Sequence, residues 1–130
     1  MSAPSALEIL VLVLLLQLKH AAFDGPFQTR WMIDGKGRFG SLPGITHAAL
    51  HAAGSLVALL LFGIPAAFAA ILALADGLVH YHVDFAKELL VRRQRWTSRD
   101  SYFWWALAAD QTLHHTTYIA MAAIVVSWAS

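Results

Sequence analysis

Long apolar runs alternate with short polar segments along this chain. Apolar side chains fill residues 6–24, 44–62, 65–90 and 102–128 almost without a break. Each run has at least the roughly 17–20 residues that a helix needs to cross the hydrocarbon core of a bilayer. The runs are too long and continuous for barrel strands, so helices are the expected way to satisfy the backbone in lipid. The pattern predicts an all-α, polytopic membrane protein, with a four-helix transmembrane bundle as a single domain over residues 1–130.

Composition supports a membrane protein rather than a soluble one. The chain of 130 residues is 58% hydrophobic and 13% charged, whereas soluble domains carry roughly 25% charged residues. A soluble domain this short has too little interior to hide so much apolar surface. Cysteine is absent, which excludes disulfides and thiolate metal ligands. The first run lacks a basic start, since Glu8 is the only charge before Lys19, so we interpret it as a retained helix and not as a cleaved signal.

The basic residues predict the orientation of the bundle. All nine lie in or beside two polar segments, within residues 19–38 and 87–99, and the turn near Gly63 has none. In a four-helix topology these two segments lie on the same side of the membrane. Since cytoplasmic loops carry an excess of Lys and Arg, both segments are placed in the cytoplasm and both termini on the non-cytoplasmic side.

Every apolar run also carries a His or Asp pair at helical i, i+4 spacing, which places both members on one helix face. Ionisable groups at membrane depth cost several kcal/mol unless they are paired, so they usually mark function. A single intramembrane His commonly only hydrogen-bonds a neighbouring helix, and a structural hydrogen-bond network is the alternative here. Four pairs, mostly in the cytoplasmic half, favour one shared site built from His20 and Asp24, His47 and His51, His80 and Asp84, and Asp110 and His114.

The chemistry of these eight residues indicates a metal site. Imidazoles and carboxylates without thiols suit zinc, iron or manganese, and the spacing does not choose among them. Facing helices that carry such ligands can hold two metal ions. We therefore predict that all eight residues bind a divalent metal ion, and that Asp84 or Asp110 ligates it or acts as a general base. Gln111 and His115 are expected to hydrogen-bond the ligand side chains and so orient them.

The same residues resemble a bacterial family of small inner-membrane proteins described as a domain of unknown function, family 3307. The resemblance covers nearly the whole chain in order, and it implies a multi-pass protein of the bacterial inner (cytoplasmic) membrane. It implies no settled activity, so function must be inferred from the chemistry. It rests on His20-Ala-Ala-Phe-Asp24-Gly-Pro-Phe-Gln28-Thr29-Arg30-Trp31-Met32 with Gly35-Lys36, on His47 and His51, on His80-Tyr-His-Val-Asp84-Phe-Ala-Lys87, and on Asp110-Gln111-Thr-Leu-His114.

Two classes of function fit such a site. The favoured one is a metal-dependent hydrolase that acts on a lipid or lipid-linked substrate, because a metal ion turns bound water into a nucleophile at neutral pH. The alternative is a non-enzymatic proton or metal-ion conduit, or a subunit of a membrane complex, since chains of Asp and His also relay protons. Haem held by two histidines is disfavoured by the carboxylates on the same faces. We expect membrane lipids as partners and no binding of nucleic acid. The protein could also form a homo-oligomer or belong to a larger membrane complex.

Overall fold

The computed structural model describes residues 4–129, in which five helices are joined by turns and short loops, with no strand among the described residues. The prediction of an all-α protein is confirmed. Residues 1–3 and 130, which the single-domain prediction also covered, lie outside the described residues. The helices are α1 (Ala6–Asp24), α2 (Arg30–Gly35), α3 (Leu42–Leu61), α4 (Ala66–Gln94) and α5 (Ser101–Ala129).

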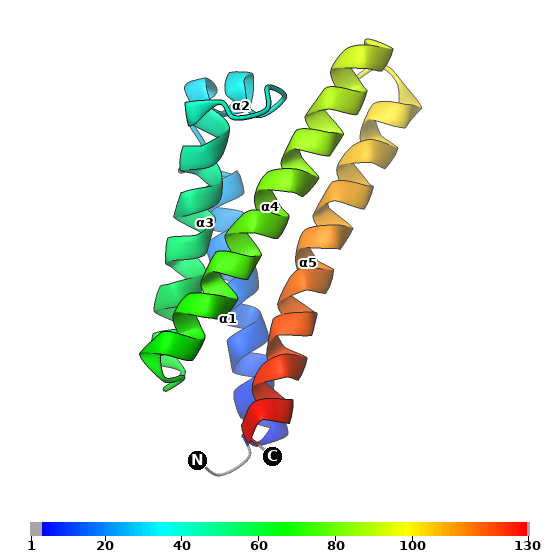
Figure 1. Cartoon of the computed structure of the whole chain (residues 1–130). Helices are drawn as coiled ribbons and strands as arrows, with labels where there is room; N and C mark the ends of the chain where they lie inside the picture. Colours follow the sequence, from blue (N-terminus) through cyan, green and yellow to red (C-terminus); the bar gives the residue numbers. More distant parts are fainter. Residues whose placement is uncertain (1–3, 130) are drawn as a thin grey trace.

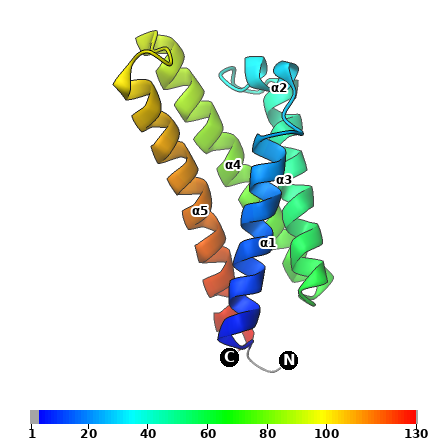
Figure 2. The ribbon, with the colours of Figure 1, turned by 180° about the vertical axis from the view of Figure 1, so that it is seen from behind.

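The four long helices run alternately up and down side by side (Figure 1). Each packs against two others, in the cyclic order α1, α3, α4, α5. The short helix α2 and the turn between α4 and α5 lie at one end, while the two ends of the chain lie at the other (Figure 1, and from behind in Figure 2). The two basic segments of the sequence therefore occupy the same end of the bundle.

Three helices, α1, α3 and α4, are long and apolar enough to cross a membrane. The fourth long helix, α5, has as many residues as α4 and packs in the same bundle. It falls short as a candidate span because its middle carries Asp110, Gln111 and two histidines among several threonines. The prediction of four transmembrane helices is thus supported by length and composition for three of them.

Local sequence signals explain where the helices begin and end. The Ser5 hydroxyl accepts from the Glu8 backbone N–H, and the Glu8 carboxylate accepts from the Ser5 N–H at 2.7 Å, which caps α1. Gly63 has a φ of 85°, a conformation that favours glycine, and it turns the chain between α3 and α4. The sequence indicated a loop through Arg38, but the chain first forms α2, because the Thr29 hydroxyl caps the Met32 N–H.

Apolar and polar side chains occupy different halves of the bundle interior. Near the chain ends, leucines from α1 and α3 pack with Tyr118 and Val125 of α5 in a fully buried cluster. Large apolar side chains such as Leu7, Leu14 and Ile71 are exposed on the outside, where lipid would cover them. Histidines and aspartates fill the interior of the half that lies toward α2. The bundle thus isolates a polar core between an apolar layer and the α2 segment.

Candidate metal centre

All eight side chains predicted to form a site point into the bundle interior. Seven of them are buried, and only the Asp24 side chain, at 17% exposure, is partly open. Because each pair is spaced four residues apart on its helix, two adjacent turns of each long helix contribute to the same layer. Their imidazole rings touch across the bundle: His51 stacks on His80 with centroids 3.6 Å apart, and His80 stacks on His114 at 4.0 Å.

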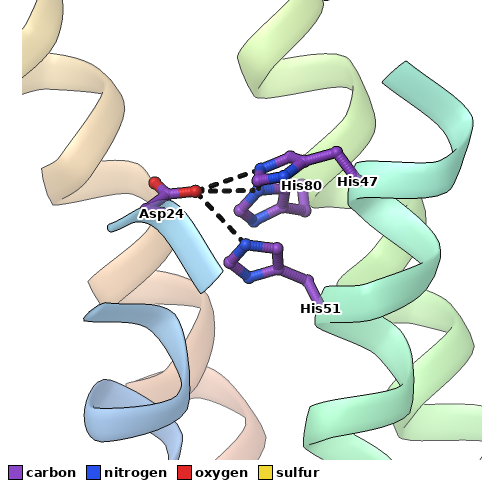
Figure 3. A group of neighbouring side chains, drawn as sticks. All are labelled: Asp24, His47, His51 and His80. Atoms are coloured by element: carbon purple, nitrogen blue, oxygen red, sulfur yellow. Dashed lines mark hydrogen bonds and ion pairs between the residues drawn. The ribbon is translucent and has the colours of Figure 1, made fainter. Parts of the chain in front are cut away.

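One carboxylate oxygen faces three imidazoles. Asp24 Oδ1 lies 3.0 Å from His47 Nε2, 3.2 Å from His51 Nε2 and 3.9 Å from His80 Nε2. The His47 and His80 Nε2 atoms are 3.1 Å apart. Figure 3 shows the carboxylate, from the end of α1, facing imidazoles from α3 and α4. One ligand atom from each of these four residues lies within 4.8 Å of all the others.

These separations are compatible with one shared metal ion. Ligand atoms about 2.1 Å from a tetrahedral ion lie about 3.4 Å from one another, and the four measured separations are 3.0 to 3.9 Å. The three shorter ones are hydrogen-bond distances as well. His51 Nε2 has no hydrogen-bond partner among the described residues. Hydrogen bonds alone therefore satisfy this group incompletely.

The other oxygen of Asp24 contacts the side chains of Gln111 and His20. Asp24 Oδ2 accepts from Gln111 Nε2 at 3.2 Å and lies 3.2 Å from His20 Nε2. His20 in turn contacts the Gln111 side-chain oxygen and the Tyr118 hydroxyl, each at 2.9 Å. Gln111 thus contacts Asp24, a proposed ligand, which is consistent with the supporting role expected of it. His20, predicted as a ligand, contacts Asp24 as well, and both of its ring nitrogens already have partners.

The remaining carboxylates form a second group beside the first. One ligand atom each from His80, Asp84 and His114 lies within 4.8 Å of the other two. Asp84 Oδ1 is 3.2 Å from His114 Nε2, and Asp110 Oδ1 is 3.4 Å from the same nitrogen. Asp84 Oδ2 faces the first group, at 3.3 Å from His47 Nε2. His80 and Asp84 connect the two groups.

Lys36 is a member of the site that the sequence did not predict. Its ammonium nitrogen lies 2.7 Å from Asp84 Oδ2 and 3.9 Å from Asp24 Oδ1, and the residue is 5% exposed. From the sequence, Lys36 was expected only to help fix the membrane orientation, as one of the basic residues of a cytoplasmic loop. Its inward direction depends on the fold of the α2 segment, where Gly35 packs against the Pro43 ring. Helical periodicity does not predict that a loop residue points into the bundle. The Gly35-Lys36 motif was the only sequence feature that singled out Lys36.

A second lysine, Lys19, is mostly buried and lies between the site and the apolar cluster. Lys19 Nζ lies 2.9 Å from Asp76 Oδ2 and 3.0 Å from the His51 carbonyl oxygen, which accepts its hydrogen bond. The Ser55 hydroxyl donates to the same Asp76 oxygen at 2.7 Å. The ammonium and the carboxylate are therefore both paired, as buried charges must be. The sequence placed Lys19 beside a basic loop, whereas its side chain turns into the bundle.

The carboxylates of the polar core outnumber its ammonium groups. Its carboxylates are Asp24, Asp76, Asp84 and Asp110, and its ammonium groups are Lys19 and Lys36. If every imidazole is neutral, two negative charges have no counter-charge. In a low-dielectric interior such charges are costly, and a bound divalent cation would offset them.

Comparison with known proteins gives the chain a family. No curated protein and no solved structure matches it. A family model described as "Protein of unknown function (DUF3307)" matches residues 10–130, which includes the four polar pairs and Lys36. The resemblance drawn from the sequence motifs is thereby confirmed, and the chain belongs to the DUF3307 family.

Proposed function

We propose that this protein is a membrane-embedded metalloprotein that hydrolyses a lipid or lipid-linked substrate. The observation that carries the proposal is the group of Asp24, His47, His51 and His80, whose ligand atoms come from three helices and lie within 4.8 Å of one another. Three of these residues are buried, and the bundle around them is apolar on the outside. A soluble protein would gain little from such an exterior, while a membrane protein needs it.

We propose a four-helix transmembrane arrangement with the metal centre near the cytoplasmic face of a bacterial inner membrane. The polar residues in the middle of α5 that lower its hydropathy include Asp110, Gln111 and His114, which point to partners inside the bundle and not to lipid. The two basic segments lie at the same end as α2. The positive-inside rule assigns that end to the cytoplasm, and both chain ends to the opposite side.

The metal ion would supply the chemistry of hydrolysis. A divalent ion, if held by Asp24 and the imidazoles, would activate a bound water molecule as a nucleophile. A tetrahedral zinc ion with four protein ligands has no position for that water, whereas iron or manganese with a higher coordination number retains one. Asp84 and Asp110, which contact His80 and His114, are the carboxylates available to accept the water's proton or to ligate metal.

The position of the centre suggests a substrate with a headgroup at the membrane surface. Asp24, the most exposed of the proposed ligands, ends α1 just before the turn through Gly25 and Pro26. Large apolar side chains around that end are exposed, among them Phe27, Trp31 and Phe39. Such side chains favour the boundary between headgroups and acyl chains. A lipid headgroup at this depth would reach the metal without leaving the membrane.

A conduit for protons or metal ions is less well supported. The polar chain extends from the histidines only as far as Lys19, Asp76 and Ser55. Beyond it, toward the chain ends, Leu12, Leu16 and other apolar side chains fill the interior as one buried cluster. A conduit within one chain would need polar groups through that layer. Association with further copies or with a membrane complex is a separate way to complete a path.

A lipid hydrolysis assay tests this proposal. We would place the purified protein in vesicles of mixed bacterial phospholipids, add zinc, iron(II) or manganese, and follow released headgroups and acyl chains by mass spectrometry. The proposal predicts metal-dependent product that His51→Phe abolishes and Asp34→Asn retains, since Asp34 is exposed and lies outside the proposed ligands. Product that forms equally with a chelator, or equally with His51→Phe, would refute the metal-dependent hydrolase.

A further inference from the structure

We propose that the bundle holds a second metal position, formed by Asp84, Asp110 and His114 beside the first one. This inference rests on the proposed function, because it extends the same centre. His114 Nε2 lies 3.2 Å from Asp84 Oδ1 and 3.4 Å from Asp110 Oδ1. Both separations are those of two ligands on one ion, about 3.4 Å. None of the three residues belongs to the group of four around Asp24.

A second observation that points to a cation here is the buried Asp110 carboxylate, one oxygen of which has no partner among the described residues. The residue is 3% exposed, and its Oδ1 atom makes no hydrogen bond with the described residues. Its other oxygen accepts from Gln111 Nε2 at 3.1 Å. A buried carboxylate oxygen without a donor costs free energy. His114 Nε2, which is 3.4 Å from Asp110 Oδ1, already has a hydrogen bond with Asp84 Oδ1. A cation between Asp110 and His114 would give Asp110 Oδ1 the partner that it lacks.

Asp84 has the geometry of a bridging ligand. Its Oδ1 atom faces His114, while its Oδ2 atom lies 3.3 Å from His47 Nε2 and 3.5 Å from His80 Nε2. One carboxylate thus presents an oxygen to each group. In two-metal hydrolytic sites the ions lie about 3.5–4 Å apart and act together on the attacking and leaving oxygens. Asp84 is placed to hold two ions at such a separation.

Lys36 sets the relative affinity of the two positions. Its ammonium group lies 2.7 Å from Asp84 Oδ2 and supplies one of the positive charges that the carboxylates need. One divalent ion balances the remaining negative charge, so a second ion must compete with the ammonium group. Lys36 follows α2 and is not part of a long helix, so its side chain can withdraw without moving the bundle. The second position therefore binds metal more weakly than the first.

The second ion would also change the first position. His80 belongs to the group around Asp24 and also lies with Asp84 and His114, so it could serve as a further ligand of the second position, but its Nε2 atom can ligate only one ion at a time. If His80 bound the second ion, the first would keep Asp24, His47 and His51 and have an open position. Three protein ligands with one open position are typical of catalytic zinc sites, whereas four are typical of structural ones. Occupancy of the second position would thus convert a closed centre into a hydrolytic one.

A groove on the outer surface leads to this second position. It has a volume of about 360 Å³ and lies between α4 and α5. Its walls are apolar, with Val83, Leu90 and Leu113 among them, and Asp110 lines it as well. Lys87, also in the lining, forms an ion pair with Glu88 at 2.6 Å. Asp110 is thus the member of the second position that lines this groove.

Metal titration of the detergent-purified, metal-stripped protein tests the inference. We would titrate manganese by calorimetry and record the electron paramagnetic resonance spectrum at one and at two equivalents. The wild type is expected to show a tight step, then a weaker one, with a spin-coupled manganese pair at two equivalents. Asp110→Asn should remove only the weaker step, and Lys36→Met should strengthen that step by about tenfold or more, since a nearby like charge is lost. The exposed Asp34 gives the matched control, Asp34→Asn, which should retain both steps.

The outcomes separate the two claims. A single tight step in the wild type and in Lys36→Met, without a coupled pair, overturns the second position and leaves the first intact. Loss of both steps in Asp110→Asn that still melts cooperatively means one shared site and also overturns it. No binding in any variant refutes the metalloprotein itself. The spectrum of the wild type decides the matter even where Asp110→Asn fails to fold.

Discussion

His51 on α3 and His80 on α4 stack almost face to face, with ring centroids 3.6 Å apart and ring planes 21° apart. The contact depends on a close approach of the two helices. A Cβ atom on Gly77 would lie 2.9 Å from Ala52 Cβ and 3.4 Å from the Ala48 carbonyl oxygen. Glycine at this position, one turn before His80, therefore lets two proposed ligands from different helices meet.

Gly77→Ala should accordingly separate α3 from α4. Overpacking of a close interface costs about 1–3 kcal/mol, so we expect a lower melting temperature together with weaker metal binding. Ala52→Gly, made in the same chain, removes the opposing methyl group and should restore most of both losses. Thermal unfolding in detergent with and without metal measures this. If Gly77→Ala binds metal as the wild type does, the close approach is not needed for the centre.

His51→Phe should separate ring packing from metal ligation. Phenylalanine can keep the stack on His80, and swaps of similar volume usually cost under about 1.5 kcal/mol, but it offers no ligand atom. We expect the metal-free variant to melt close to the metal-free wild type, while the stabilisation that added metal gives to the wild type disappears. Full retention of that stabilisation would exclude His51 as a ligand.

Lys19 should be required as the partner of Asp76. Removing one member of a buried ion pair costs about 3–5 kcal/mol, because the other charge is left uncompensated. Lys19→Met is therefore expected to destabilise the protein strongly. Lys19→Met with Asp76→Asn should recover much of the loss, since the neutral amide can still accept from Ser55. Equal stability of the single and the double variant would show that the 2.9 Å pair contributes nothing as a pair.

Reporter fusions test the proposed orientation. A reporter that is active only outside the cytoplasm should be active when fused after Ser130 and inactive when inserted between Arg92 and Arg99. The reason is that both basic segments lie at one end of the bundle and both chain ends at the other. Activity at both points, or at the inner one alone, would contradict four membrane crossings with this orientation.

The helical fold and much of the polar core were predictable because both follow helical periodicity. Uninterrupted apolar runs indicate helices, and an i, i+4 pair such as His47 and His51 must share a face. Once every run carries such a pair, convergence of the pairs inside the bundle is the simplest way to keep them out of lipid. The side chains of both residues are indeed buried in the bundle.

The inward positions of Lys36 and Lys19 and the contacts of His20 depend on tertiary packing, which helical periodicity does not encode. Lys36 reaches the core only because the α2 segment folds back over the bundle end, and Lys19 turns inward only because Asp76 faces it from α4. The supporting place of His20 is of the same kind. It shares a helix face with Asp24, yet Gln111 and Tyr118 occupy both of its ring nitrogens. Sequence spacing selects the face of a residue but not its partner across the bundle.

The metal content of the purified protein shows whether the group around Asp24 Oδ1 is a metal centre. We would purify the wild type without chelators, in parallel with Asp24→Asn and His51→Phe, and determine bound zinc, iron and manganese by inductively coupled plasma mass spectrometry. We expect at least one equivalent of one of these metals in the wild type and far less in both variants, because each loses an atom of the group around Asp24 Oδ1. A folded wild type without stoichiometric metal, whose melting temperature none of the three ions raises, would contradict it.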